Sequence, residues 1–208
     1  MKHNGFEYVD LGLPSGTKWA KYNVGANSET DYGLYFAFGE TNGYNRFTNG
    51  DRTFDRRNYK FSNKSFIYNF TKYNNTDGKE VLDLCDDAAY IHMGGKWHMP
   101  TDEQIRELKS NTISDWVTNY NGSGVNGILF ISKSDTRKKL FLPASGCLSN
   151  FFSESAGKVC YYWSSSIYNN NDCYGFIFNI RSSLISVALS NRNDGNTVRG
   201  VFNTFWMK

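Results

Sequence analysis

The sequence predicts an α+β domain with two short helices in its first half and a curled antiparallel sheet in its second half. Past residue 116, short apolar runs alternate with Gly, Asn and Ser clusters, a pattern typical of short strands joined by turns. Helical signals are confined to two stretches, and no internal repeat or linker is visible. The 208 residues, 17% of them aromatic, suffice for one core, so we expect a single domain over 1–208.

The N-terminal elements are predicted from turn chemistry. Phe6 to Leu11 reads as a strand closed by the Leu-Pro-Ser-Gly turn at 13–16, and a short strand follows around Trp19. Residues at about 42–80 are rich in Asn, Gly, Thr and aromatic residues but show little periodicity. This composition predicts a loop insertion whose aromatic side chains attach it to the body.

Two helices are predicted in the middle of the chain. The first covers about 84–92, with acidic residues at its start and the Gly94–Gly95 pair as its end. The second covers about 101–110, because Thr101 and Gln104 have the spacing of a capping box. The later strand candidates are Gly127 to Ser132, Lys139 to Leu142, Tyr161 to Ser164, Tyr174 to Ile180, Leu184 to Leu189 and Val198 to Phe202.

Strand alternation assigns faces to the C-terminal elements. In Tyr174 to Ile180 it predicts that three residues point inward, namely Phe176, Phe178 and Ile180. It places three nearer the solvent, namely Tyr174, Asn179 and, with a poor fit, Ile177. Trp163 is expected to anchor the start of the C-terminal segment in the core, and Val198 and Val201 its end. Arg199 is expected to be a structural hydrogen-bonding residue, because an apolar strand would bury it.

Five amino acids are absent from the C-terminal segment. Between Ser164 and Phe205 there is no Lys, Glu, Gln, Met or Trp, although the rest of the chain uses all five. An Asn codon begins with two adenines and ends in a pyrimidine. Changes at those adenines can produce every residue from Ile167 to Thr197 and none of the five absent ones. On composition alone, the gap favours a Ser/Asn-rich exposed region of strands and loops. Adenine-specific mutagenesis of Asn codons is the other interpretation, and it becomes the leading one only together with the family resemblance described next.

Six sequence blocks, in this order, resemble one family. They are VDLGLPSGTKWAKYNVGA (9–26), YGLYFAFGET (32–41), DDAAYIHMGGKWHMPTDEQIREL (86–108), LFLPASG (140–146), YYWSSSIY (161–168) and NTVRGVF (196–202). The family is the paralogous domain family of Bacteroidetes and their phages that is named after a major paralogous family in Fibrobacter. The resemblance covers nearly the whole chain except the insertion.

The resemblance implies a C-type-lectin-like fold, in the branch close to formylglycine-generating enzymes. Members with a hypervariable C-terminus are variable proteins of diversity-generating retroelements, which write adenine-directed changes into the 3′ end of a gene. It therefore implies a non-enzymatic protein whose variable region, at about 164–197, binds a ligand or receptor. The expected partner is a variable protein or glycan ligand on a cell surface. The alternatives are an oxygenase of the formylglycine-generating type and a structural appendage domain.

The candidate contact residues lie in two runs expected to be exposed, Tyr168 to Tyr174 and Ser190 to Asn196, and on the strand between them. Tyr and Asn suit adaptable recognition because they combine rigid area with hydrogen bonding. The expected ligand-binding residues are Tyr168, Asn170, Asp172, Tyr174, Asn179, Arg181, Ser190, Arg192, Asn193, Asp194 and Asn196.

Charge and hydropathy exclude other classes of partner. The net charge of +3 with no long basic run gives no reason to expect nucleic acid. No apolar run is long enough for membrane insertion, and the N-terminus has no apolar signal-peptide region. Together with the family resemblance, the missing signal peptide implies a virion-associated phage protein, and the other expectation is a protein of an extracellular surface. A homo-oligomer is expected only by analogy with trimeric phage receptor-binding proteins.

Catalytic and metal-binding interpretations are weaker. His92 and His98 flank the glycine pair, but no third metal ligand is obvious nearby. Asp83, Asp86 and Asp87 have the chemistry of calcium ligands, yet their place before a helix explains them more simply. We expect no catalytic residue, cofactor or metal.

The four cysteines, Cys85, Cys147, Cys160 and Cys173, do not form a Cys-x-x-Cys pair. A disulfide between Cys147 and Cys160 is one reading, and free buried thiols are the other. An oxygenase of the formylglycine-generating type needs a reactive cysteine pair in the C-terminal core. Only Cys173 lies in that segment here.

Overall fold

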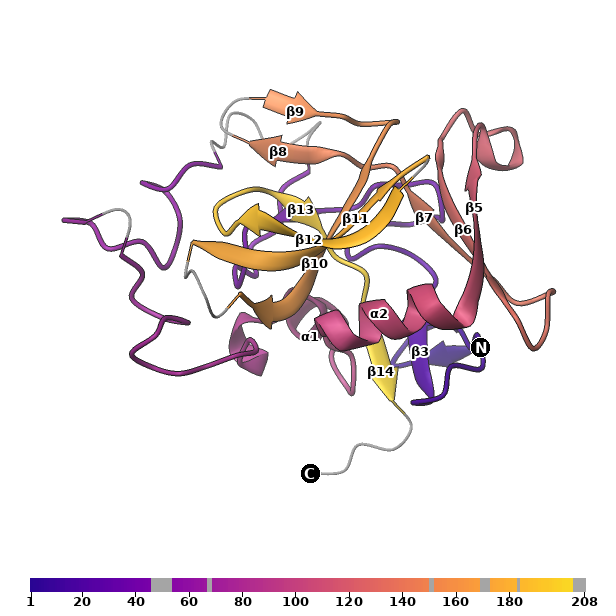
Figure 1. Cartoon of the computed structure of the whole chain (residues 1–208), viewed down its shortest axis with the longest axis horizontal. Coiled ribbons are helices and arrows are strands. Elements are labelled where there is room, and N and C mark those ends of the chain that lie inside the picture. Colours follow the sequence, from indigo (N-terminus) through magenta and orange to yellow (C-terminus); the bar gives the residue numbers. More distant parts are fainter. Residues whose placement is uncertain (46–53, 67–68, 150–151, 169–172, 183, 204–208) are drawn as a thin grey trace.

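A five-stranded sheet built mainly from the C-terminal half of the chain lies at the centre of the computed structural model (Figure 1). The structure describes residues 1–45, 54–66, 69–149, 152–168, 173–182 and 184–203. The strand order is β12 (Leu184–Asn191), β11 (Tyr174–Arg181), β10 (Cys160–Ile167), β13 (Asn196–Thr197) and β4 (Tyr35–Phe36). Neighbours are antiparallel except β10 and β13, which run parallel.

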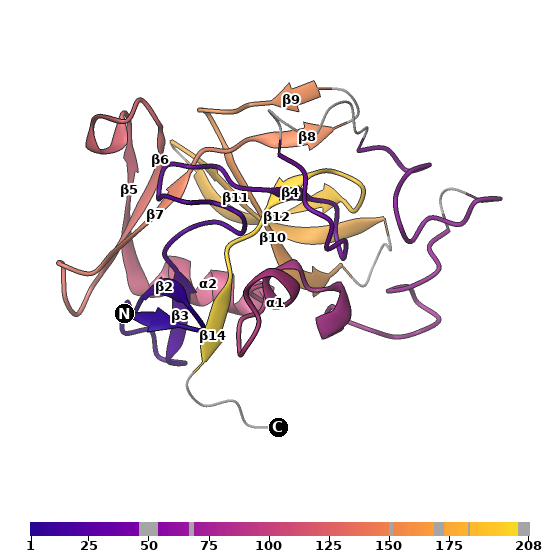
Figure 2. The ribbon, with the colours of Figure 1, turned by 180° about the vertical axis from the view of Figure 1, so that it is seen from behind.

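A second sheet joins the two ends of the described chain. It contains β1 (Lys2–His3), β2 (Phe6–Val9), β3 (Thr17–Ala20) and β14 (Val201–Asn203), in that order. Figure 2 shows β14 beside the N-terminal strands. The last described strand therefore closes the domain against the first ones.

Two smaller sheets flank the centre. One contains β5 (Thr112–Val117), β6 (Gly127–Ser132) and β7 (Lys139–Pro143), and the other pairs β8 (Cys147–Ser149) with β9 (Phe152–Glu154). Figure 1 shows the second pair above the central sheet and the first at its side. The α+β class, with two short helices and a curled antiparallel sheet, is confirmed.

The two helices form where capping predicts them. α1 (Ala88–Met93) follows the 3-10 turn η1 (Leu84–Asp86) and ends at Gly94, whose φ of 63° favours glycine. α2 (Asp102–Asn111) begins with the expected capping box, since the Thr101 side chain accepts from the Gln104 N–H and the Gln104 side chain accepts from the Thr101 N–H. A further 3-10 turn, η2, spans Tyr120–Gly122. None of the described helices has the length and apolarity needed to cross a membrane.

The central sheet separates two hydrophobic clusters. On one face Phe178 and Ile180 pack with α2 and β6, and on the other Trp163 and Ile177 pack with residues 35–38 and the insertion. The face assignment from alternation is therefore right for Phe178 and Ile180. It is wrong for Ile177, which is buried, and for Phe176, which is only half-buried. Alternation fails here because both faces of the sheet are covered, so an outward side chain can also be buried.

The expected anchors of the C-terminal segment are confirmed. Trp163, Val198 and Val201 are fully buried, and the Trp163 indole N–H donates to the Phe36 carbonyl at 2.8 Å. Arg199 is also buried. Its guanidinium donates to the Asn23 side-chain oxygen at 2.7 Å and to the carbonyls of Ala20, Lys21 and Phe141. It thus ties the closing segment to β3 and β7.

The insertion is attached by aromatic side chains, as expected, within the described part of residues 42–80. Five of its rings are buried in the cluster around Trp163: Phe54, Tyr59, Phe61, Phe70 and Tyr73.

Two strands differ from the prediction. Strand β5 was not predicted, because it follows α2 without a turn signal. The predicted strand Val198 to Phe202 is shorter than expected, because Val198–Gly200 is an irregular segment that precedes β14.

Replacement of Trp163 by Ala is expected to lower the free energy of unfolding by about 3–5 kcal/mol, because loss of the indole ring leaves a cavity in the core. Leu184 to Ala is the control, since Leu184 is half exposed and should change stability by about 0.5 kcal/mol or less. Chemical denaturation of both variants measures the difference, and equal losses would contradict the assignment of Trp163 to the core.

Candidate ligand-binding site

One group of candidate residues lies together at an end of the central sheet. Tyr161, Asn179 and Ser186 stand opposite one another on β10, β11 and β12, so their side chains share a face. All three are half-buried, and Arg181 and Leu184, which also pair, are exposed. The Arg181 Nη2 lies 3.4 Å from the Tyr161 hydroxyl. We name these five residues the sheet-end surface.

Asn179 is the residue of this surface with an unsatisfied group. Its side-chain Oδ1 is buried and has no hydrogen-bond partner among the described residues. A buried amide oxygen without a donor costs free energy. Because this oxygen is enclosed, the polar groups that the sheet-end surface presents are those of the exposed Arg181 and the half-buried Tyr161.

A second group is aromatic and lies toward the other end of the strands. The Tyr168 and Phe176 rings meet edge to face at 5.6 Å, and Phe176 stands opposite Leu189. Tyr174 and Tyr168 are half-buried, and the Tyr168 N–H donates to the Tyr174 carbonyl at 3.3 Å. We name Tyr168, Tyr174, Phe176 and Leu189 the aromatic surface. Asn170 and Asp172, two further predicted contact residues, lie outside the described residues.

Arg192 was expected to be exposed, and this is wrong: its side chain is 0% exposed. The guanidinium carbon lies 4.5 Å from the centre of the Phe70 ring. Four other rings have their centres within 6.0 Å of it, those of Phe38, Tyr59, Phe61 and Tyr73. Four of the five rings belong to the insertion, so the insertion encloses the arginine in an aromatic cage.

Hydrogen bonds fix the orientation of the Arg192 guanidinium inside this cage. It donates to the Tyr59 hydroxyl at 3.1 Å, the Tyr73 carbonyl at 2.9 Å and the Lys72 carbonyl at 3.0 Å. The Arg192 carbonyl accepts from the Phe38 N–H at 2.8 Å. A buried cation with three such acceptors stabilises the fold, and it is out of reach of a ligand.

The residues after Arg192 are also buried, which corrects the expectation for Asn193, Asp194 and Asn196. Leu148 of β8 exchanges backbone hydrogen bonds with Gly195, and the Asn193 amide donates to the Phe54 carbonyl. A side chain at Gly195 would place its Cβ 2.6 Å from the Phe54 ring. Because the insertion and β8 cover this run, it turns inward.

Asp194 holds the start and end of the run together. Its carboxylate accepts from Ser149 at 3.1 Å, Ser190 at 3.0 Å and the Asn191 amide at 3.2 Å. Burial raises the pKa of Asp194 despite these donors. Ser190, half-buried, also accepts from the Asn196 amide at 3.2 Å. Ser190 therefore belongs to this internal network, although the sequence predicts it at the binding surface.

The structure thus divides the predicted contact residues. Asn179 and Arg181 meet on the sheet-end surface, Tyr168 and Tyr174 meet on the aromatic surface, and the run from Ser190 is structural. Sequence reasoning missed Tyr161 and Ser186. Strand alternation could have identified them, because residues two apart in a strand share a face and Tyr161 therefore lies on the same face as Trp163. Antiparallel pairing of the next two strands then places Asn179 and Ser186 beside Tyr161.

The acidic residues before α1 pair with lysines. Asp83, Cys85 and Asp86 form the one grouping of potential metal ligands found among the described residues. The Asp86 carboxylate accepts from Lys60 at 2.6 Å, Lys72 at 2.5 Å and the Tyr73 hydroxyl at 2.6 Å. Burial opposes its charge, but these donors hold the pKa of Asp86 below its ordinary value. The cluster therefore acts as a clamp on the insertion.

Asp87 caps the first helix and does not join that clamp. Its carboxylate accepts from the N–H groups of Tyr90 and Met99 at 2.9 and 2.8 Å. The two histidines are separately engaged: the His92 ring lies 2.8 Å from the Thr41 carbonyl and the His98 ring 2.8 Å from the Met99 carbonyl. Burial lowers the pKa of His98, which favours the neutral ring.

All four cysteines are free thiols, so the Cys147–Cys160 pairing is not formed. Of the four only Cys160 is fully buried, and burial raises the pKa of its thiol well above the ordinary value. Its Sγ–H donates to the Leu142 carbonyl at 3.5 Å.

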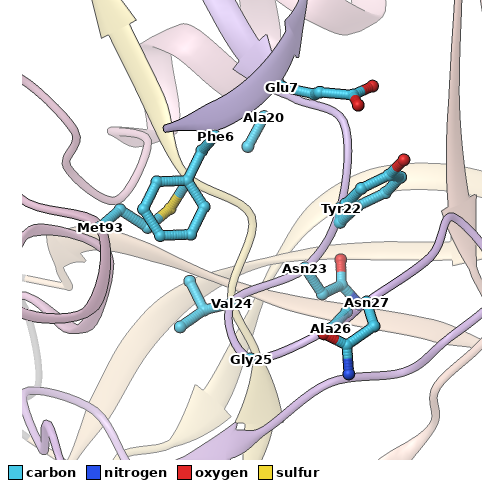
Figure 3. Close-up of a pocket in the computed structure, with 10 residues that line it drawn as sticks. All are labelled: Phe6, Glu7, Ala20, Tyr22, Asn23, Val24, Gly25, Ala26, Asn27 and Met93. Atoms are coloured by element: carbon cyan, nitrogen blue, oxygen red, sulfur yellow. The ribbon is translucent and has the colours of Figure 1, made fainter. Parts of the chain in front are cut away.

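A pocket of about 190 Å³ lies away from both surfaces, between the N-terminal sheet and α1 (Figure 3). Phe6, Val24 and Met93 supply apolar walls, and Tyr22 stands at its other side. None of the predicted contact residues lines it. The Glu7 carboxylate at its rim pairs with Lys21 at 3.2 Å.

Comparison with known proteins gives no match to this chain among family models, curated proteins or solved structures.

Replacement of Arg192 by Ala is expected to lower the free energy of unfolding by about 3–5 kcal/mol, because it leaves an aromatic cavity and unpaired carbonyls. Arg192 to Lys should restore only part of the loss, since an ammonium cannot reproduce the planar fork. Arg181 to Ala, on the neighbouring strand but exposed, is the matched control and should leave stability nearly unchanged. Denaturant titration decides, and equal effects of the two alanine variants would show that the cage is not formed.

Proposed function

We propose that this protein is a non-enzymatic binding protein with a C-type-lectin-like fold, in the formylglycine-generating-enzyme-like branch, whose surface is diversified by adenine-specific mutagenesis. It serves receptor recognition by a phage or at a cell surface, and its ligand is a protein or glycan on that surface. The observation that carries the proposal is a coincidence of sequence and geometry. The residue gap covers β11 and β12, and those strands supply most of the sheet-end and aromatic surfaces.

The geometry supports binding because the variable positions rest on a fixed core. Trp163 and Val198 are buried at the two ends of the region at about 164–197, and Phe178 and Ile180 on β11 pack into the core. Changes at Asn179, Ser186 or Tyr174 therefore alter a surface without removing a core side chain. Strand positions also hold side chains more firmly than loop positions do, which lowers the entropic cost of binding.

The chemistry of the surfaces supports an adaptable contact. The sheet-end surface combines a tyrosine, a guanidinium and a half-buried asparagine, and the aromatic surface adds two tyrosines and two apolar side chains. Tyrosine and arginine are enriched at the energetic centres of interfaces. Every residue in both surfaces from Tyr168 onward is one that adenine changes in an Asn codon can produce.

The genetic part of the proposal is tested in the neighbouring DNA. We expect a reverse transcriptase gene and a near-copy of the 3′ end of this gene that differs from it at adenines. A near-copy with differences spread over all four bases would contradict adenine-specific diversification.

The binding part is tested with labelled protein on a glycan array and on a panel of Bacteroidetes cells. Exchange of residues 164–197 with those of a second variant of the same scaffold should transfer the binding preference. In the unexchanged chain, Tyr174 to Ala and Arg181 to Ala should each weaken binding by about tenfold or more. Arg137 to Ala is the control, because Arg137 is highly exposed and lies away from both surfaces, between β6 and β7. Binding that follows the scaffold, or that depends on Arg137 as strongly as on Arg181, would contradict the proposal.

A further inference from the structure

Strand β12 is an open edge of the central sheet. It is the first strand in the order of that sheet and pairs only with β11 along residues 184–191. In such an edge strand, alternate residues direct their N–H and C=O groups away from the sheet. Among the described residues, the one backbone hydrogen bond to this outer edge is at its end, where the Asn191 carbonyl accepts from the Asp194 N–H at 2.9 Å. Helix α2 packs across β10, β11 and β12 alike, on the face of the sheet, so it does not cover the edge.

This edge lacks the charged residues, proline and short length that keep the other edge strands from pairing with another chain. Its sequence, LISVALSN, contains no charged residue and no proline, and Leu184 and Leu189 are 50% and 39% exposed. The other long edges in the described part of the chain are guarded, β5 by the exposed Asp115 and β7 by Lys139 and Pro143. The edge strands β1, β4 and β14 have two or three residues each. Long, apolar and uncharged edges are templates for pairing with another strand.

We infer that β12 pairs with β12 of a second copy of this chain, antiparallel and about a two-fold axis. The pleat stays in phase when the axis passes through Val187 or Ala188, because opposite residues must share a face. With the axis at Val187, Ile185 stands opposite Leu189 of the second copy and Ser186 opposite Ala188 of the second copy. Every pair in this register is uncharged, so the two strands do not repel each other.

A second copy fits this edge better than an unrelated strand. The two-fold arrangement is isologous, so one surface serves both partners and the assembly closes. It also removes both open edges at once, whereas an unrelated strand covers one edge and leaves the other molecule's edge open. The inference does not depend on the proposed function, since it rests on main-chain geometry.

The pairing has a consequence for the surfaces described above. The two five-stranded sheets become one continuous sheet, and an axis perpendicular to it keeps Ser186 of both copies on the same face. The two sheet-end surfaces then lie on one side of the dimer. A ligand that repeats on a cell surface would be bound through both copies at once.

Sedimentation velocity of the intact chain tests the inference between about 1 and 100 µM, a range suited to an interface of modest size. We expect a monomer of 23.8 kDa in equilibrium with a dimer of twice that mass. The double variant Leu184 to Lys with Leu189 to Lys should raise the dimer dissociation constant at least about tenfold, because charged side chains on an edge strand oppose its pairing with another strand. If the double variant does not fold, Leu184 to Lys alone serves. The control is Ile113 to Lys, because Ile113 is 51% exposed on the guarded edge strand β5.

Hydrogen exchange locates the interface. Amides of β12 should become more protected as the protein concentration rises, and the lysine variants should lose this dependence. A monomer at every concentration overturns the inference, as does a dimer that the β12 lysines leave intact and the β5 lysine disrupts. Protection of the outward-pointing β12 amides that is independent of concentration also overturns it, because the edge is then covered by its own chain.

Discussion

The fold of the C-terminal segment depends on one interaction, the enclosure of the Arg192 guanidinium by five aromatic rings. The cage joins three parts of the chain that are distant in sequence: the insertion, the Phe38 region and the turn after β12. Burying a cation costs a large solvation free energy, which only good geometry and several acceptors offset. For Arg192 the faces of the aromatic rings, the Tyr59 hydroxyl and two backbone carbonyls offset this cost. The insertion therefore serves to enclose Arg192.

This constraint divides a segment that is uniform in composition into two kinds of position. From Arg192 to Asn196 the chain is held inside by the cage, by Asp194 and by β8, and side chains there have partners that a substitution would remove. On β11 and β12, half-exposed side chains stand on a buried core, where substitution changes a surface. Half-exposed positions and structural positions thus alternate within about thirty residues of one chain.

Much of the fold could be predicted from local signals. The capping box at Thr101, the glycine stop at Gly94 and the strand at 127–132 all lie where the sequence places them, because each depends on residues close in sequence. Arg199 was predicted correctly because its neighbours in the sequence, Val198, Val201 and Phe202, are apolar and place it among buried residues. The exposure of residues 192–196 was predicted wrongly, because polar composition resembles a solvated loop when its partners are unknown. Those partners, Tyr59, Phe70 and Ser149, come from segments whose place against the sheet no local pattern encodes.

The most direct measurement is a codon-by-codon comparison of the 3′ end of this gene, across many copies, with the near-copy that the proposed diversification requires as its template. Diversification of a surface on a fixed core predicts adenine-derived changes at codons 174, 179, 181 and 186 of the gene copies. At codon 192 it predicts that the template encodes arginine and that every gene copy keeps it. Frequent adenine-derived replacement of Arg192 in folded proteins, with codons 179, 181 and 186 constant, would contradict this division between display and support.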